Sequence, residues 1–306
     1  MTRVLVTGSD GLVGTALREL IKNDCYFATR ADGDLRIFQE VEKVFLKVKP
    51  DKVIHLAAVV GGLGGNLLHP GELFRDNSLI NINVLELSRI YKVEKLVSLM
   101  STCVFPAEAR FPLTIDQLHG GSPHESSFGY AYAKRMLEVQ SAAYRKEFGC
   151  NFVTIIPTNI YGPADNWNLE NGHVIPSLIH KFYLAKKASL DVSLWGTGSP
   201  YREFIFSKDV ARLILWTLSN YNDTLPLILS PSDEISIKNL AEMVSEEIGF
   251  QGDILWESEK PDGQLRKPSS SAELQSLIPN LSFTPLQQGI KETVDWFVVN
   301  YPNLRL

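Results

Sequence analysis

Short runs of β-branched and other apolar residues alternate with longer helical patterns through the first half of the chain. Continuous apolar runs, in place of strict alternation, are typical of strands that are buried on both faces of a sheet. Strands that alternate with helices favour βαβ units, and hence a parallel sheet with helices on both faces. The predicted strands are residues 4–6, 26–29, 53–56, 96–100 and 152–156, and the predicted helices are 13–22, 37–48, 72–91 and 130–148.

The pattern changes after Pro157. Residues 161–173 are rich in Gly, Pro and Asn, which predicts a loop. We therefore expect a first domain over residues 1–160 and a smaller C-terminal α/β substrate domain over 161–306, with segments near 195–220 returning to the first sheet. The second half is predicted to contain helices at 175–186, 210–220, 237–248 and 286–299, a strand at 192–195 and a turn at 196–200.

Composition narrows the class of protein. Of the 306 residues, 44% are hydrophobic and the net charge is −5, which excludes intrinsic disorder. Acidic residues (35) outnumber basic ones (30), so we expect neither a nucleic-acid nor a membrane partner. There is no signal-peptide pattern, and no apolar run approaches the ~20 residues of a membrane span. Three cysteines cannot form a disulfide framework, so we expect a cytoplasmic protein in a reducing compartment.

A glycine-rich turn joins the first predicted strand to the first helix with the spacing G-x-x-G-x-x-G. Gly8 allows the tight turn, Gly11 lets the backbone approach a pyrophosphate, and Gly14 lets helix and strand pack closely. The helix N-terminus then directs free N–H groups at the phosphates. A plain tight turn is the alternative, but the position after strand one favours a Rossmann-type doubly wound sheet that binds a dinucleotide. The residues expected at the cofactor here are Gly8, Asp10, Gly11, Leu12, Val13 and Gly14.

The end of the second strand indicates which dinucleotide is bound. NAD sites usually place an acid there for the ribose 2′-hydroxyl, whereas NADP sites need a cation for the 2′-phosphate. Arg30 occupies this position and favours NADPH/NADP+, while Asp32 two residues later is compatible with NAD. An ordinary exposed charge is the alternative for Arg30. Asp34 and Leu35 are then expected beside the adenine.

A Tyr-x-x-x-Lys pair stands at the start of the predicted helix 130–148, so Tyr130 and Lys134 lie on one face. A phenol has an ordinary pKa of ~10, and the neighbouring ammonium is expected to lower it. Ser101, after the fourth strand, can hydrogen-bond the same carbonyl oxygen. A surface pair is the alternative, but with the glycine turn these residues favour proton donation to a carbonyl that a hydride reduces.

Together these motifs resemble the extended short-chain dehydrogenase/reductase family. Within that family, the chain is similar over essentially its whole length to NADPH-dependent epimerase-reductases that act on a GDP-linked sugar. The resemblance implies conversion of GDP-4-keto-6-deoxy-D-mannose to GDP-L-fucose, by epimerisation at C3 and C5 and reduction at C4. Another nucleotide-sugar 4-reductase or 4-epimerase, and a non-enzymatic NADP-sensing protein, stay open. The similar blocks are residues 55–58, 101–106, 130–136, 157–163, 172–176, 195–198 and 202–204.

Thr102 and Cys103 follow the serine where the 4,6-dehydratases of the family carry Asp and Glu. A thiol, whose pKa of ~8.5 a cationic site can lower, is a credible base for protons next to a C4 ketone. A histidine with a pKa of ~6.5 is a credible proton donor. The resemblance places Cys103 and His173 in these roles. From their spacing alone, a buried small hydrophobe and a surface histidine are the alternatives.

The resemblance also implies the remaining binding residues and the assembly. The cofactor contacts that it adds are Ala57, Ala58, Lys134, Pro157, Asn159 and His173. The substrate contacts that it implies are Asn159, Val174, Lys181, Leu194, Trp195, Arg202 and Lys267, with Lys181, Arg202 and Lys267 near the GDP diphosphate and ribose. We expect no metal. Helices near 77–91 and 136–148 carry apolar stripes, and the matching helices of the family form a four-helix bundle, so a homodimer is expected.

Overall fold

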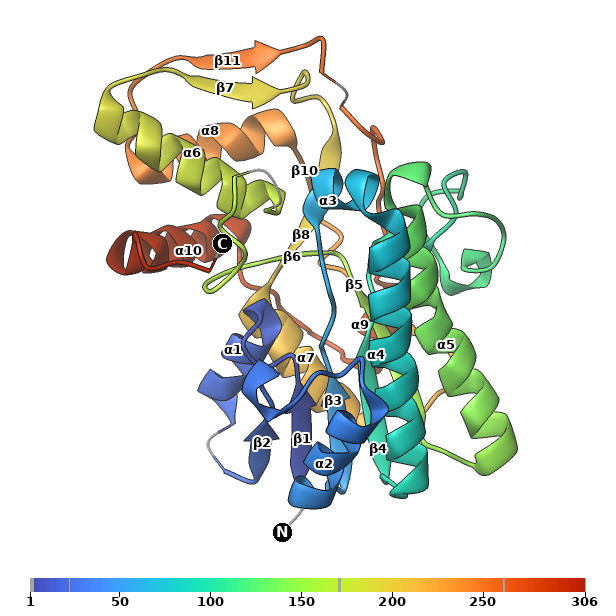
Figure 1. Cartoon of the computed structure of the whole chain (residues 1–306). Helices are drawn as coiled ribbons and strands as arrows, with labels where there is room; N and C mark the ends of the chain where they lie inside the picture. Colours follow the sequence, from blue (N-terminus) through green and yellow to red (C-terminus); the bar gives the residue numbers. More distant parts are fainter. Residues whose placement is uncertain (1–2, 22, 170–171, 261, 306) are drawn as a thin grey trace.

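The computed structural model describes residues 3–21, 23–169, 172–260 and 262–305. Its larger part is a six-stranded sheet in which every neighbouring pair is parallel (Figure 1), as the alternating pattern predicts. Val4 lies opposite both Cys25 and Lys52, which fixes the register at the centre of the sheet. The strands in spatial order are β2 (Cys25–Phe27), β1 (Val4–Thr7), β3 (Lys52–His55), β4 (Lys95–Leu99), β5 (Phe152–Pro157) and β9 (Leu227–Leu229).

Helices cover both faces of this sheet. One face packs against α2 (Phe38–Val48), α4 (Pro70–Ile90) and α5 (Phe128–Phe148), and the other against α1 (Leu12–Leu20) and α7 (Ser207–Asn220). Local sequence defines the two long helices. Pro70 is the first residue of α4, where its missing N–H costs no hydrogen bond, and Gly149 ends α5 in the left-handed conformation.

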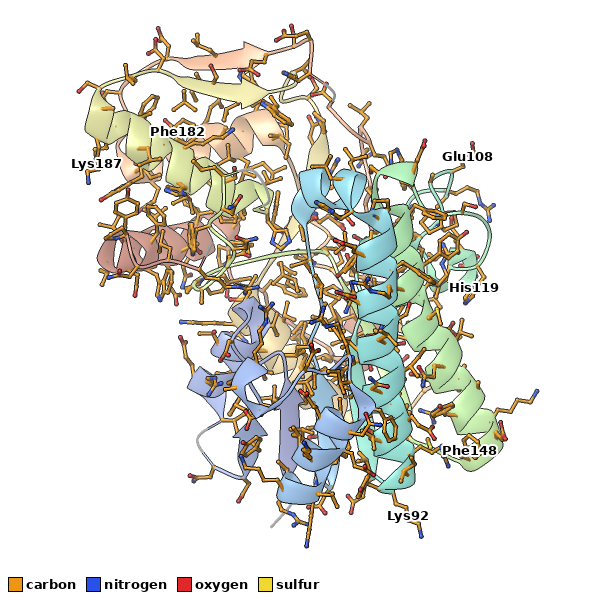
Figure 2. All side chains as sticks on the ribbon, viewed as in Figure 1. Lys92, Glu108, His119, Phe148, Phe182 and Lys187 are labelled. Atoms are coloured by element: carbon orange, nitrogen blue, oxygen red, sulfur yellow. The ribbon has the colours of Figure 1, made fainter. Side chains whose placement is uncertain are left out.

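A smaller part lies beyond the carboxyl ends of the strands (Figure 1). Three helices enclose a second apolar core there, and Figure 2 shows Phe182 inside it. The helices are α6 (Val174–Ala188), α8 (Ile237–Ile248) and α10 (Leu286–Asn300). Two short sheets complete the fold: β7 (Val192–Trp195) pairs with β11 (Ile254–Glu257), and β8 (Tyr201–Phe206) lies between β10 (Glu234–Ser236) and β6 (Asn159–Tyr161).

The second half departs in places from the predicted elements. The second half of the chain contributes strand β9 to the large sheet. The segment 192–195 instead pairs with β11 in a separate two-stranded sheet. Helix α7 packs beside α1 on the large sheet. Strands of three or four residues are too short for their apolar pattern to predict them one by one. The sequence pattern also does not predict the short helices α3 (Gly62–Leu68) and α9 (Ala272–Leu277). The domain boundary near residue 160 stays a prediction.

Two predicted elements contain residues that lie outside the described ranges. Lys22, the predicted last residue of the first helix, lies outside the described residues, as do Glu170 and Asn171 in the predicted loop 161–173. Tyr161, its first residue, ends β6. None of the helices in the described ranges combines the length and the apolar character that a membrane-spanning segment needs.

The order of the strands places a switch point at β1, where open parallel sheets have their ligand crevice. β1 has β2 on one side and β3 on the other, so the direction in which the chain adds strands reverses there. In open parallel sheets, ligands bind outside the carboxyl ends of the strands at such a switch point. The residues after β1 and after β3 therefore define where a ligand is to be sought.

A close approach between α4 and α5 gives a test of the fold. A Cβ on Gly129 of α5 would overlap the carbonyl oxygen of Pro70 in α4, whereas a Cβ on Gly71 would meet nothing within 4 Å. We expect Gly129→Ala to destabilise the protein by about 1–3 kcal/mol, the usual cost of overpacking. Gly71→Ala, the control, should be neutral or stabilise it by roughly 0.5–1 kcal/mol. Thermal unfolding measures both; equal melting temperatures would contradict this account of the helix pair.

Candidate active site

The turn after β1 has the geometry that its glycines predict. Gly8 has φ +69°, and a Cβ there would lie 2.6 Å from the backbone nitrogen of Ala57, directly after β3. A Cβ on Gly14 would lie 2.5 Å from Cα of Ser9. A side chain at either position would push the turn away from β3 or α1 away from the turn. Both positions therefore require glycine.

The same turn leaves the N-terminus of α1 open to an anion. Gly11 precedes the helix, no side chain caps it, and its first turn holds no acid. The Gly11 N–H bonds to the Gly8 carbonyl at 3.1 Å, so the N–H groups of the next residues are left for a ligand. Asp10 is exposed and faces Arg18 at 3.2 Å. The cradle fits the diphosphate of a dinucleotide.

The structure separates the roles of the two charged residues after β2. Asp32 accepts hydrogen bonds from the Thr29 N–H at 3.0 Å and from the Tyr26 hydroxyl. These bonds, and the nearby Lys47, lower the pKa of Asp32 to about 2. Arg30 is exposed and has no ion pair within the described part of the chain. Asp32, the acid that would suit NAD, is thus hydrogen-bonded within its own turn. Arg30, the cation that suits NADP, is left available for a 2′-phosphate.

A buried polar chain connects the glycine turn to α5. Thr7 Oγ1 lies 2.8 Å from His55 Nδ1, and His55 Nε2 lies 3.1 Å from Asn81 Oδ1. Asn81 Nδ2 then donates to the Ala133 carbonyl at 3.0 Å, one residue before Lys134. Burial, together with the charge of Lys134, lowers the pKa of His55 to about 3. The neutral imidazole therefore serves as a fixed link between the turn and the helix.

Ser101, Cys103, Tyr130 and Lys134 lie together above β4 and at the start of α5. Cys103 follows Ser101 in a short 3-10 helix (Thr102–Val104). Lys134 Nζ donates to the Leu99 carbonyl at 2.9 Å and lies 5.9 Å from the centre of the Tyr130 ring. Burial lowers the pKa of Lys134 to about 8. The predicted i, i+4 pair is therefore brought to the end of β4.

The direction of the Tyr130 pKa differs from the prediction. Burial, with a smaller contribution from Cys103, raises the pKa of Tyr130 above its ordinary value, whereas we expected the ammonium to lower it. The reason is that burial removes water from the phenolate and so disfavours the charged form. The phenol is therefore protonated in the free protein, which is the form from which a proton donor starts.

Cys103 is half-buried beside cationic side chains. Burial raises the pKa of its thiol, while the charge of Lys267, a hydrogen bond with Ser101 and the charge of Lys134 act in the opposite direction. Burial lowers the pKa of Lys267, and the charge of Arg202 lowers it further, so these two cations are neighbours. Besides burial, the group that acts on the pKa of Lys181 is Glu257 of β11. Lys267 is thus the predicted diphosphate residue beside the thiol, and Arg202 acts on Lys267 in turn.

His173 precedes α6 and is paired with an acid. Its Nδ1 lies 3.1 Å from Oδ1 of Asp165, whose side chain is 3% exposed. The negative charge of Asp165 raises the pKa of His173, against the effect of burial. With Nδ1 directed at the carboxylate, Nε2 is the nitrogen that can exchange a proton with a ligand.

The remaining predicted substrate residues differ in what they can contact. Trp195 is 62% exposed, with Lys260 Nζ 5.5 Å from its ring, and Val174 is 41% exposed at the start of α6. Leu194 is 3% exposed inside the smaller core, so only its backbone is available. Asn159 is exposed and donates to the Glu203 carbonyl at 2.8 Å.

Further predicted cofactor residues lie at the ends of β2, β3 and β5. Ala57 and Ala58 follow β3 beside the glycine turn, and Pro157 is the buried last residue of β5. After β2, Asp34 is bound by Arg36 at 2.6 Å, and Arg36 also reaches Asp76 at 2.9 Å. Leu35 packs on the edge of the larger core. In the ranges that the structure describes, no group of His, Cys, Asp and Glu could hold a metal ion.

Two residues that sequence reasoning missed organise the site. Asp165 lies in an aperiodic loop, and nothing in its spacing indicates a contact with His173. Glu203 sits in a recognised sequence block, but its partners are distant in sequence: Ser230 Oγ and the Ser269 N–H, both at 3.0 Å. Burial raises the pKa of Glu203 to about 7. This carboxyl connects the strand that carries Arg202 to the segment that carries Lys267.

The Asp165–His173 pair yields a prediction. We expect Asp165→Asn to lower the pKa of His173, because removal of the negative charge removes what stabilises the imidazolium. The readout is an NMR titration of the imidazole C–H signals. The control Glu147→Gln, which removes an exposed carboxylate on α5, should leave that titration unchanged. An unaltered His173 titration in Asp165→Asn would show that the carboxylate does not set the charge of the ring.

Comparison with known proteins agrees with this geometry. Residues 4–227 match the NAD dependent epimerase/dehydratase family. The GDP-L-fucose synthase of Dictyostelium discoideum is 48% identical over 99% of this chain and 97% of its own, and a probable GDP-L-fucose synthase of Drosophila melanogaster is 39% identical over 100% of both. The crystal structure of a GDP-L-fucose synthetase from Naegleria fowleri bound to NADP superimposes with a TM-score of 0.94 at 40% identity, covering 100% of this chain and 96% of that one. This chain therefore belongs to the NAD dependent epimerase/dehydratase family, as its resemblance to the extended short-chain dehydrogenases/reductases implied.

Proposed function

We propose that this protein converts GDP-4-keto-6-deoxy-D-mannose to GDP-L-fucose with NADPH, the activity for which its similar relatives are named. The observation that carries the proposal is the set of groups at one strand end: a thiol next to the Ser101, Tyr130 and Lys134 set. A plain reductase or 4-epimerase needs the latter three and has no use for the thiol. An imidazole with its own carboxylate, His173, supplies the second proton-transfer group.

The first half of the reaction is proton transfer next to a ketone. The C4 carbonyl makes the protons at C3 and C5 acidic, and Ser101 and Tyr130 can donate hydrogen bonds to the enolate oxygen that forms on their removal. Cys103 as thiolate accepts a proton from one face of the sugar, and His173 as imidazolium returns one to the other face. Burial raises the pKa of the Cys103 thiol in the free protein, and Lys267 and Lys134 act against that effect, toward the thiolate that the step needs. Asp165 raises the pKa of His173 and so favours the imidazolium.

The second half is reduction at C4. NADPH, when bound, supplies a hydride to the carbonyl carbon. Tyr130, whose phenol is protonated in the free protein, donates its proton to the carbonyl oxygen. Lys134 stabilises the phenolate that is left, and Ser101 holds the same oxygen by a hydrogen bond. The glycine turn would hold the diphosphate of NADPH, and Arg30 its 2′-phosphate.

The GDP portion needs cations and a surface for the base. Arg202 and Lys267 are neighbours beside Cys103, and we propose that they bind the diphosphate. We propose that the sugar contacts Asn159 and Val174. The nucleoside would extend toward Lys181, the backbone of Leu194 and the exposed ring of Trp195.

We also propose a homodimer, and a cytoplasmic location that keeps all three cysteines, which are unpaired here, reduced. α4 and α5 pack side by side at one edge of the molecule (Figure 1). Their outer sides expose large apolar side chains, such as Leu79 and Ile82 on α4 and Val139 on α5. A second copy of the same pair would cover them as a four-helix bundle.

Two variants separate the two halves of the reaction. With the ketosugar in deuterated water, Cys103→Ser should abolish deuterium uptake at C3 and C5 while some direct C4 reduction remains. Tyr130→Phe should lower NADPH consumption by about a hundredfold or more, because the proton donor is gone. Cys150→Ser, which changes a half-buried thiol outside the site, is the control with wild-type behaviour. NMR of the product and absorbance of NADPH are the readouts, and a wild-type protein that leaves NADPH unconsumed would contradict the proposed function.

The dimer has its own measurement. Light scattering should give the wild-type protein twice its chain mass of 34.2 kDa at micromolar concentration. The double substitution Leu79→Lys/Ile82→Lys places charges in the proposed interface and should yield monomers. Leu46→Lys, on exposed α2, is the matched control and should stay dimeric. A monomeric wild-type protein would refute the four-helix bundle.

A further inference from the structure

The end of the chain returns to the active-site crevice. After α10, residues 301–305 run toward the loop before α6, where the Arg305 carbonyl accepts a hydrogen bond from the Trp167 N–H at 2.9 Å. Trp167 is fully buried and stacks on Trp296 of α10 at 6.0 Å between ring centroids. Figure 1 shows this end of the chain beside α10. The terminal segment is thus fixed next to Asp165, two residues from Trp167.

The Arg305 side chain reaches the glycine turn. Its Nη1 lies 3.7 Å from the position that a Cβ on Gly11 would take, and Gly11 is the residue that precedes α1. The same guanidinium acts electrostatically on His173, whose pKa it lowers. One cation therefore lies between the N-terminus of α1 and the proton-transfer histidine.

No other cation in the described part of the chain is free at this turn. Arg18 is engaged with Ser9 Oγ at 2.7 Å and with Asp10 at 3.2 Å. Arg305 is exposed and forms no ion pair with a described residue. A diphosphate carries negative charge that helix N–H groups offset only in part, and a guanidinium can donate two parallel hydrogen bonds to it.

We propose that Arg305 binds the diphosphate of the dinucleotide cofactor and thereby joins the end of the chain to the cofactor and to the loop that carries Asp165. The inference rests on the proposed use of NADPH. It adds a cofactor residue from a part of the chain about 290 residues beyond the glycine turn, outside the residues 4–227 that match the family.

Binding of the diphosphate and protonation of His173 are coupled through Arg305 in this proposal. In the free protein the charge of Arg305 disfavours the imidazolium of His173. A bound diphosphate would offset that charge, so binding of NADPH is expected to raise the pKa of His173. The cofactor would then favour the proton-donating form of the histidine before the sugar arrives.

The test measures binding to the full-length protein by calorimetry. Arg305→Ala should weaken NADPH binding by about tenfold to a hundredfold, the loss of one charge-assisted pair, and Arg305→Lys by less. Adenosine 2′-monophosphate, which carries no phosphate at the 5′ position, should bind Arg305→Ala and wild type equally. Arg30→Ala should weaken both ligands. Arg110→Ala, which removes an exposed arginine in another loop, is the control with unchanged affinities.

NMR titration of His173 separates a contact from a structural effect. NADPH should raise the His173 pKa in the wild-type protein and raise it less in Arg305→Ala. Equal NADPH affinities for wild type and Arg305→Ala would overturn the inference and leave the proposed function standing, as would a parallel loss of affinity for adenosine 2′-monophosphate. A wild-type protein that binds no NADPH would instead overturn the proposed function together with this inference.

Discussion

The contact between the turn after β1 and the first residues after β3 is the constraint on which the site depends. Gly8 approaches the backbone of Ala57 so closely that no side chain fits between them, and its positive φ turns the chain directly into α1. The approach occurs where the strand order reverses, so the N-terminus of α1 opens onto the crevice. Any residue larger than glycine would separate the turn from β3 and remove the cradle for a diphosphate.

The same region fixes the catalytic helix. Thr7, the last residue of β1, is linked through the neutral His55 and Asn81 to the backbone of α5 beside Lys134. Because every member of this chain is buried and hydrogen-bonded, a shift of the turn would break bonds that water cannot replace. Burial also sets the protonation states, since it keeps the phenol of Tyr130 protonated and lowers the pKa of Lys134 to about 8.

The proposed proton-transfer groups come from both sides of the crevice. His173 and Asp165 belong to the smaller part, and Cys103 to the larger one, where Lys267 reaches it from the C-terminal third of the chain. The site is therefore assembled only when both parts are folded against one another. This arrangement explains why residues distant in sequence, such as Glu203 and its serine partners, are buried around the site without contacting a reacting atom in the proposed mechanism.

The sequence by itself determined the local features: the buried parallel strands, the long helices with their caps, the glycine turn, and the placement of Tyr130 and Lys134 on one helix face. These depend on periodicities of a few residues and on glycine's lack of a Cβ, which a sequence displays directly. Only the tertiary structure decided that β9 completes the sheet, that Asp32 is held by its own turn, and that Asp165 pairs with His173. Such contacts join residues through space, and the balance between desolvation and charge that sets their pKa values exists only once the chain has buried them.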